Sequence, residues 1–302
     1  MTGENITEKS EVLGNLLENL VAGTDQLSHE IAVRFIARRM SGVNLALPLD
    51  CEEQKRILSI AQAYCCPYNL PPPPPFIEQS LSAFPHLPYH MALHYGLNQF
   101  PSEMQKKVVG KDVIDGGGYC GDSAMIFTEY NPRKVYTFEP NPDTLPIMEQ
   151  TLMDNADVLG ERKDRIEIIP AALGRSKGTL TFHSRGVSDG GATAMAHLFP
   201  GAFNKANVYQ VDVVSIDEFV EQQALSVGLI KLDVEGAEYD TILGAKNTIT
   251  EQKPLLIISL YHTFKDFFEI KPLIESWGLD YKFEIRHHCP SAPDWEFVLM
   301  AY

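Results

Sequence analysis

Residues 113–123 read VIDGGGYCGDS, an apolar run that ends in an aspartate and three consecutive glycines. The stretch contains a literal G-x-G-x-x-G at Gly116, Gly118 and Gly121. That spacing is typical of a dinucleotide-binding loop after the first strand of a doubly wound sheet. The match is weak alone, because three adjacent glycines can meet such a spacing by accident. The stretch therefore predicts a strand and a glycine turn, with the ligand still to be decided.

The chain around this turn alternates between strands and helices. Apolar strand-like runs occupy residues 112–117, 134–140, 165–173, 228–236, 254–262, 281–288 and 296–302. A helix is expected over 142–156, and two short strands over 178–184 and 207–216 flank a loop that we interpret as a lid or binding loop. The alternation predicts a parallel, doubly wound α/β sheet. The last two runs have no helix between them and predict an antiparallel hairpin at one edge.

The first part of the chain is expected to be helical. Apolar residues recur every three or four positions at Leu13, Leu16, Leu17, Leu20 and Val21, then at Ile31, Phe35, Ile36 and Met40, and a third helix is expected over 52–64. Five prolines, Pro71 to Pro75, cannot continue a helix. We therefore divide the chain into residues 1–76, a helical region with a stiff connector, and residues 77–302, the α/β domain.

Charge and composition limit the class of partner. The formal net charge of −15 disfavours nucleic acid as the main partner, because a phosphate backbone requires a basic surface. The N-terminus lacks the basic and apolar regions of a signal peptide, and no apolar run is long enough to span a bilayer. Five cysteines without metal-ligand spacing fit a reduced protein. We expect a cytoplasmic protein with a small-molecule partner. The sequence does not indicate the oligomeric state.

Three acidic residues at strand ends favour a nucleoside cofactor. A carboxylate at Asp115, at the mouth of the glycine turn, would repel a pyrophosphate and suits the cationic amino-acid end of S-adenosylmethionine. Glu139 follows the second strand, where an acid can accept hydrogen bonds from ribose hydroxyls of either S-adenosylmethionine or NAD. Asp233 ends a later strand. The carboxyl ends of parallel strands face one ligand crevice, so the three acids are expected at one edge.

Six stretches together resemble the FkbM family of S-adenosylmethionine-dependent O-methyltransferases. They are VIDGGGYCGDSA, VYTFEPNP, IPAALG, VSIDEF, IKLDVEGAEYDTILGA and ISLYH, and the resemblance covers about residues 108 to 302. Gly116 and Gly118 stand where the family more often has Val and Ala. The resemblance implies a class I methyltransferase fold, a Rossmann-like sheet of seven strands with the last antiparallel.

The resemblance also implies roles for individual residues. The loop from Asp115 to Gly121 would hold the methionine end of the cofactor, and Glu139 the ribose. The remaining implied cofactor contacts are Gly117, Tyr119, Asn141, Ala171, Ala172 and Asp233. Family members methylate hydroxyl groups of sugars, polysaccharides and polyketide-like molecules, so the acceptor is expected to be a saccharide or a saccharide-bearing small molecule.

Methyl transfer to an alcohol requires a base, because the hydroxyl must lose its proton. His262 closes the strand next to the one that carries Asp233 and Glu235, and an imidazole beside a carboxylate is a common base arrangement. His262, Glu235 and Asp233 are therefore the candidate catalytic residues. Magnesium at Asp233 and Glu235 is an open but less favoured alternative, and no metal site is assigned. Two other functions also stay open: an NAD-dependent oxidoreductase that uses the glycine motif literally, and a non-catalytic interaction protein that acts through residues 1–76.

Overall fold

The computed structural model describes residues 3–41, 52–71, 89–185, 192–193, 206–289 and 295–302. Its centre is a seven-stranded sheet in the order β10-β11-β9-β8-β1-β2-β3. The strands are β1 (Asp112–Gly116), β2 (Lys134–Phe138), β3 (Ile166–Ile169), β8 (Val227–Leu232), β9 (Leu255–Ser259), β10 (Phe283–His287) and β11 (Phe297–Ala301). Six of these strands lie inside stretches that the sequence predicts as strands, and β8 begins one residue before its predicted stretch.

Strand direction in the sheet confirms the expected topology. Neighbouring strands from β3 across to β9 are parallel, whereas β11 runs antiparallel to both β9 and β10. In the middle of the sheet, Gly116 at the end of β1 pairs with Phe138 of β2 and with Leu232 of β8. The turns that follow β1, β2, β8 and β9 therefore meet at one edge.

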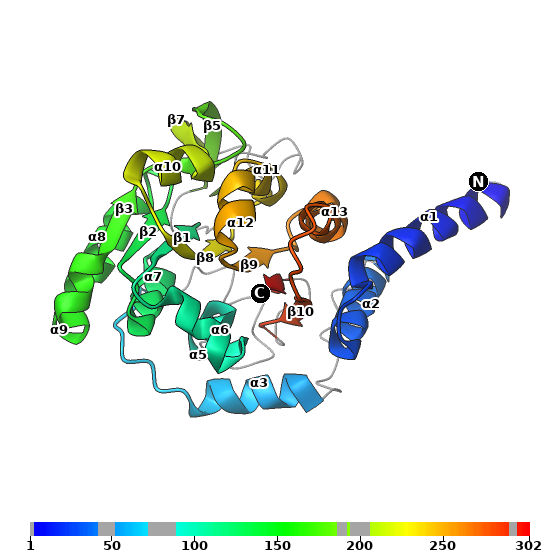
Figure 1. Ribbon diagram of the computed structural model, residues 1–302, viewed down its shortest axis with the longest axis horizontal. Coiled ribbons are helices and arrows are strands. Elements are labelled where there is room, and N and C mark those ends of the chain that lie inside the picture. The colour runs from blue at the N-terminus through cyan, green and yellow to red at the C-terminus, as the bar shows by residue number, and fades with distance from the viewer. Residues whose placement is uncertain (1–2, 42–51, 72–88, 186–191, 194–205, 290–294) are drawn as a thin grey trace.

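Helices cover both faces of the sheet (Figure 1). Successive residues of a strand point to opposite faces, so Val113 and Leu229 belong to one apolar cluster while Ile114 and Ile230 belong to the other. The first face is covered by α7 (Asp122–Phe127) and α8 (Leu145–Asp154), and the second by α10 (Ile216–Gln223), α11 (Glu238–Leu243), α12 (Lys246–Gln252) and α13 (Phe264–Glu275). Burial on both sides explains why the parallel strands read as continuous apolar runs.

A smaller sheet lies beside the main one. Its order is β4-β7-β5-β6, formed by β4 (Ala172–Leu173), β7 (Asn207–Val214), β5 (Gly178–Ser184) and β6 (Ala192–Thr193). The two expected strands at 178–184 and 207–216 are thus confirmed. Asp143, in the turn after β2, accepts hydrogen bonds from Ser184 Oγ and Tyr209 Oη at 2.7 Å each. These contacts tie the small sheet to the turn that follows Glu139. The loop expected as a lid lies largely outside the described residues.

The first two helices pack into the core of the α/β domain. They are α1 (Gly3–Val21) and α2 (Gln26–Ser41), and they lie beside α13 and β10 (Figure 1). The ring centroid of Phe35 on α2 is 4.4 Å from that of Phe267 on α13 and 4.5 Å from that of Phe297 on β11. Leu20 and Ile31 belong to the same apolar cluster. The N-terminal helices therefore do not form a core of their own.

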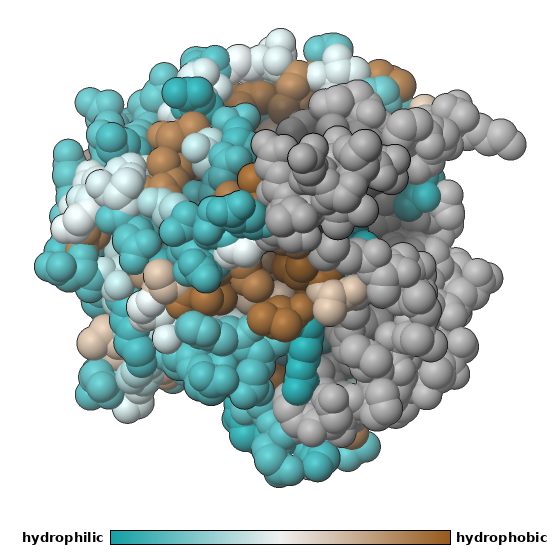
Figure 2. Space-filling view, turned by 90° about the vertical axis from the view of Figure 1, so that its right-hand side faces the viewer, coloured by the Kyte–Doolittle hydropathy of each residue, from teal (hydrophilic) through white to brown (hydrophobic). Residues whose placement is uncertain are grey.

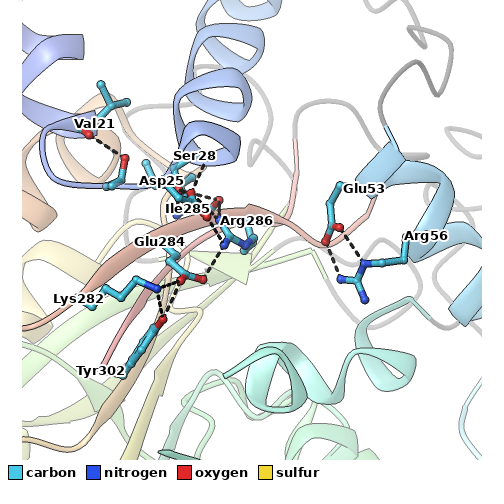
Figure 3. A network of polar contacts seen from close by, with 11 residues as sticks. Val21, Asp25, Ser28, Glu53, Arg56, Lys282, Glu284, Ile285, Arg286 and Tyr302 are labelled. Atoms are coloured by element: carbon cyan, nitrogen blue, oxygen red, sulfur yellow. Dashed lines mark hydrogen bonds and ion pairs between the residues drawn. The ribbon is translucent and has the colours of Figure 1, made fainter. Parts of the chain in front are cut away.

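A polar network fixes α2 to strand β10 (Figure 3). Arg286 Nη2 donates to Asp25 Oδ2 and to Glu284 Oε2, both at 2.6 Å. Ser28 Oγ accepts from the backbone N–H of Ile285 at 2.8 Å. Burial opposes the charge of Asp25, but hydrogen bonds from Arg286 and Ser28 hold its pKa at about 2.

The third helix is α3 (Glu52–Ala63), close to the predicted range of 52–64. Its Ile57 and Ala61 pack with Tyr89 and Ala92 of α5 (Tyr89–Ala92). The proline run from Pro72 to Pro75 and the boundary at residue 76 lie outside the described residues. The division into 1–76 and 77–302 therefore stays a prediction.

Figure 2 shows one face of the molecule, on which most coloured residues are hydrophilic and apolar residues gather in patches near the middle. Within the ranges that the structure describes, none of the helices combines the length and apolar character needed to cross a bilayer.

Candidate active site

The glycine turn after β1 is pressed against the ends of two neighbouring strands. A Cβ on Gly117 would lie 1.8 Å from the backbone oxygen of Asp233, and a Cβ on Gly118 would lie 2.0 Å from Thr137 Oγ1. Gly117 and Gly121 also have φ angles of +79° and +85°, which side chains rarely adopt. The glycines are therefore required by packing and backbone conformation, whichever ligand the turn holds.

Asp115 lies beneath the turn rather than at its mouth, which corrects the position expected from the sequence. The residue is 0% exposed. Its Oδ2 accepts from Ser123 Oγ at 2.7 Å and from Thr137 Oγ1 at 3.0 Å, and its Oδ1 lies 3.3 Å from Lys231 Nζ. The carboxylate thus neutralises a buried lysine and braces the turn, so any effect of Asp115 on a bound ligand is indirect.

Lys231 extends this bracing to the glycine turn. Its Nζ donates to the carbonyl oxygens of Gly117 at 2.8 Å and Gly116 at 3.2 Å. Burial works against the lysine charge, but the nearby carboxylates, Asp115 first, raise its pKa. The charged lysine on β8 therefore holds the turn in place.

Glu139 occupies the position expected for a ribose-binding acid. It directly follows β2 and is 7% exposed. Its Oε2 accepts from the backbone N–H of Tyr119 at 3.0 Å, and its Oε1 accepts from that of Asn141 at 2.9 Å. Burial raises the pKa of Glu139 to about 7. Each oxygen keeps a lone pair for a further donor, so the carboxylate can bind two hydroxyl groups.

The residues expected around an adenine lie in the neighbouring turns. Asn141 Nδ2 donates to Thr144 Oγ1 at 2.7 Å, and Asn141 Oδ1 accepts from the N–H of Asp143 at 3.1 Å. Ala171 and Ala172, after β3, are both buried. The Asn141 side chain therefore shapes its own turn, and a direct contact of these residues with a cofactor stays a prediction.

The candidate catalytic residues come together at the ends of β8 and β9. His262 Nε2 lies 3.6 Å from Asp233 Oδ1 and 3.6 Å from Glu235 Oε2. Tyr261 Oη donates to Asp233 Oδ1 at 3.0 Å. The side chains of Asp233 and Glu235 remain 29% and 56% exposed, whereas His262 is 9% exposed. The arrangement offers two accessible carboxylates above a nearly buried imidazole.

Glu238 is the functional candidate that the sequence reasoning missed. Its side chain is 0% exposed, and its Oε1 lies 2.9 Å from His262 Nδ1. The same carboxylate accepts the backbone N–H groups of Val234 at 2.7 Å and Gly236 at 2.9 Å. It therefore holds both the imidazole and the turn that carries the other acids. The signal was its place in DVEGAE, three residues after Glu235.

The protonation of this cluster differs from a simple base arrangement. Burial opposes a charge on His262, but Glu238 and Glu235 raise its pKa well above the ordinary value. Desolvation raises the pKa of Glu235 to about 7, opposed by the charge of His262 and assisted by those of Asp233 and Glu238. An imidazolium cannot accept a proton, whereas the ionised carboxylate of Glu235 can.

Two residues of the site have strained backbone conformations. Tyr119 and Glu235 have φ angles of 44° and 56°, in the left-handed region that is uncommon for residues with a side chain. Such conformations persist where surrounding contacts impose them, and they concentrate at ligand-binding sites. Here the contacts that impose these conformations are the hydrogen bond of Glu139 with Tyr119 and that of Glu238 with the turn around Glu235.

Comparison with curated proteins finds methyltransferases. Over 203 residues the chain is 26% identical to "Methyltransferase 1" of Beauveria bassiana, covering 61% of this chain and 75% of the relative. Over 153 residues it is 27% identical to the 2-O-methyltransferase NoeI of Sinorhizobium fredii, covering 47% of this chain and 60% of that protein.

Comparison with solved structures includes an FkbM methyltransferase from Methylobacillus flagellatus. The TM-score is 0.49 at 21% sequence identity, and the match covers 76% of this chain and 58% of that one. The seven-stranded sheet with its antiparallel β11 is the class I methyltransferase fold. Residues 115–285, more than half of the chain, match the family described as the methyltransferase FkbM domain. The chain therefore belongs to the FkbM methyltransferase family.

Proposed function

We propose that the protein is an S-adenosylmethionine-dependent O-methyltransferase that acts on a hydroxyl of a saccharide or a saccharide-bearing small molecule. The assignment of S-adenosylmethionine as cofactor rests mainly on the geometry of Glu139. Its buried carboxylate is oriented by two backbone N–H groups, from Tyr119 and Asn141, and retains acceptor capacity for two ribose hydroxyls.

The charges near the glycine turn favour S-adenosylmethionine over NAD. A dinucleotide places its pyrophosphate at the helix that follows the first strand. In this chain that helix, α7, begins with Asp122. A carboxylate at this place disfavours a pyrophosphate, and the sulfonium and ammonium groups of S-adenosylmethionine have the complementary sign.

The strand-end cluster fits the chemistry of methyl transfer to a hydroxyl. The methyl carbon leaves the sulfonium sulfur as it bonds to the acceptor oxygen, which produces S-adenosylhomocysteine. Alignment supplies much of the rate because the cofactor is already activated. The acceptor proton passes to the Asp233–Glu235–His262 cluster, with the carboxylate of Glu235 as first acceptor and His262 as the charge that stabilises the resulting anion.

The proposal of a saccharide acceptor rests on the side chains at the cluster and on one relative. Asp233 and Glu235 are partly exposed acceptors for sugar hydroxyls, and the Tyr261 ring lies beside His262. The NoeI relative is by its name a 2-O-methyltransferase.

Incubation with S-adenosylmethionine and a panel of mono- and oligosaccharides tests the proposal. Mass spectrometry should detect a product one methyl group heavier than one acceptor, together with S-adenosylhomocysteine. Glu235→Gln should slow this transfer with little change in cofactor affinity. If S-adenosylhomocysteine forms and the methyl group appears on nitrogen or carbon, the hydroxyl assignment is wrong while methyl transfer stands.

A further inference from the structure

We propose that Asp233, Glu235 and His262 form a binding site for one divalent transition-metal ion. The site extends beyond methyl transfer as proposed above, and its occupation can be measured whether or not that proposal holds. Three features carry it: an imidazole nitrogen without a hydrogen-bond partner in the described part of the chain, two carboxylate oxygens at equal distance from it, and a buried acid that orients the ring.

The unpartnered atom is His262 Nε2. It is buried, in a side chain that is 9% exposed, and has no hydrogen-bond partner among the residues that the structure describes. Its distances of 3.6 Å to Asp233 Oδ1 and to Glu235 Oε2 exceed ordinary hydrogen bonds. Two ligands of one ion, each bonded at about 2.1 Å in tetrahedral geometry, lie about 3.4 Å apart. The observed spacing therefore fits shared coordination better than direct hydrogen bonding.

Glu238 supplies the orienting contact that metal-bound histidines commonly have. The other ring nitrogen, Nδ1, lies 2.9 Å from Glu238 Oε1. A buried carboxylate at Nδ1 holds a proton there, so an ion would displace only the Nε2 proton of the imidazolium and bind that atom. Glu238 already accepts two backbone N–H groups, which assigns it this orienting role rather than direct coordination.

The donor set indicates the class of ion. The proposed donors are His262 Nε2 and one carboxylate oxygen each from Asp233 and Glu235, both 3.6 Å from that nitrogen. One imidazole with carboxylates suits Zn²⁺ or Mn²⁺ better than an all-oxygen ion such as Mg²⁺. Because Asp233 and Glu235 are partly exposed, the ion would face the side from which an acceptor arrives. A metal-bound hydroxyl loses its proton more readily, so the ion would assist the base.

Calorimetric titration of chelator-treated, full-length protein with MnCl₂ and with ZnCl₂ tests the site. We expect one ion per chain, with affinity at least about tenfold weaker in Asp233→Asn and His262→Gln. His29→Gln, on α2, is the matched control and should bind as the wild type does. Pulsed electron paramagnetic resonance of Mn²⁺ bound to wild-type protein should show coupling to an imidazole nitrogen, a readout that needs no variant.

Absence of stoichiometric binding overturns the proposal, and so does binding with no nitrogen coupling. Equal affinity in wild type and both ligand variants also overturns it. S-adenosylhomocysteine is titrated in parallel. If it binds and neither ion does, the metal site fails while the proposed function stands. If an ion binds as expected and S-adenosylhomocysteine does not, the metal site is supported and the cofactor assignment fails.

Discussion

His262 Nδ1 and Glu238 Oε1 are 2.9 Å apart, and the carboxylate is completely buried. This contact joins the ends of β8 and β9, because Glu238 also accepts backbone N–H groups from the turn after β8. One carboxylate therefore sets the positions of the imidazole and of the turn that carries Asp233 and Glu235. The contact makes Glu238 a positioning residue, although no catalytic step involves it directly.

Replacement of Glu238 by Gln should lower the pKa of His262, because a charged partner is lost. It should also lower the free energy of unfolding by about 1–3 kcal/mol, since one buried backbone N–H loses its acceptor. The imidazole titration followed by long-range ¹H–¹⁵N NMR measures the first effect, and urea unfolding the second. Glu149→Gln, exposed on α8, is the control and should change stability by less than about 0.5 kcal/mol.

The same contact gives a pH dependence of stability. The pKa of His262 is higher in the folded protein than the ordinary 6.5. The contribution of His262 to the free energy of unfolding is therefore fully present below pH 6.5. It is lost as pH rises through the pKa of His262 in the folded protein. Urea midpoints of wild type should fall over this window more than those of Glu238→Gln. If the urea midpoints of the two proteins fell equally with pH, Glu238 would not be the group that raises the pKa of His262.

Gly117→Ala should destabilise the glycine turn strongly. The added methyl group would meet the backbone oxygen of Asp233 at 1.8 Å, at a φ of +79°, and neither can be relieved without moving the turn. We expect a loss of at least about 2 kcal/mol in the free energy of unfolding. Gly178→Ala, at a position with nothing within 4 Å, should unfold close to wild type in the same urea titration. Similar losses for both variants would contradict the packing described for the turn.

Phe35→Ala tests whether α2 belongs to the core of the α/β domain. The ring packs on Phe267 and Phe297, so its removal should cost about 3–5 kcal/mol in one cooperative transition. Val33→Ala lies on the same helix but is 52% exposed, and should cost far less. A small loss for Phe35→Ala, or a separate early transition for the N-terminal helices, would instead favour an independent N-terminal unit.

Strands were predictable from the sequence because residues such as Val113 and Ile114 are buried on opposite faces, which produces an unbroken apolar run. The convergence of Asp233, Glu235 and His262 also followed from strand order alone. The burial of Asp115 did not, because its partners Ser123, Thr137 and Lys231 come from three separate elements. The role of Glu238 could not be predicted either, because the sequence does not distinguish a buried glutamate in a helix from an exposed one.

Calorimetric titration with S-adenosylhomocysteine and, separately, with NAD tests the cofactor most directly. Wild-type protein should bind S-adenosylhomocysteine and not NAD. Glu139→Ala should weaken that binding by at least about tenfold, the cost of about 1.5–3 kcal/mol for lost hydrogen bonds to a charged group. Affinity should also rise as pH increases through about 7, because burial raises the pKa of Glu139 to that value and its carboxylate form is the better acceptor. Clear binding of NAD with none of S-adenosylhomocysteine would favour a dinucleotide-binding role for the glycine motif and would contradict the proposed methyltransferase activity.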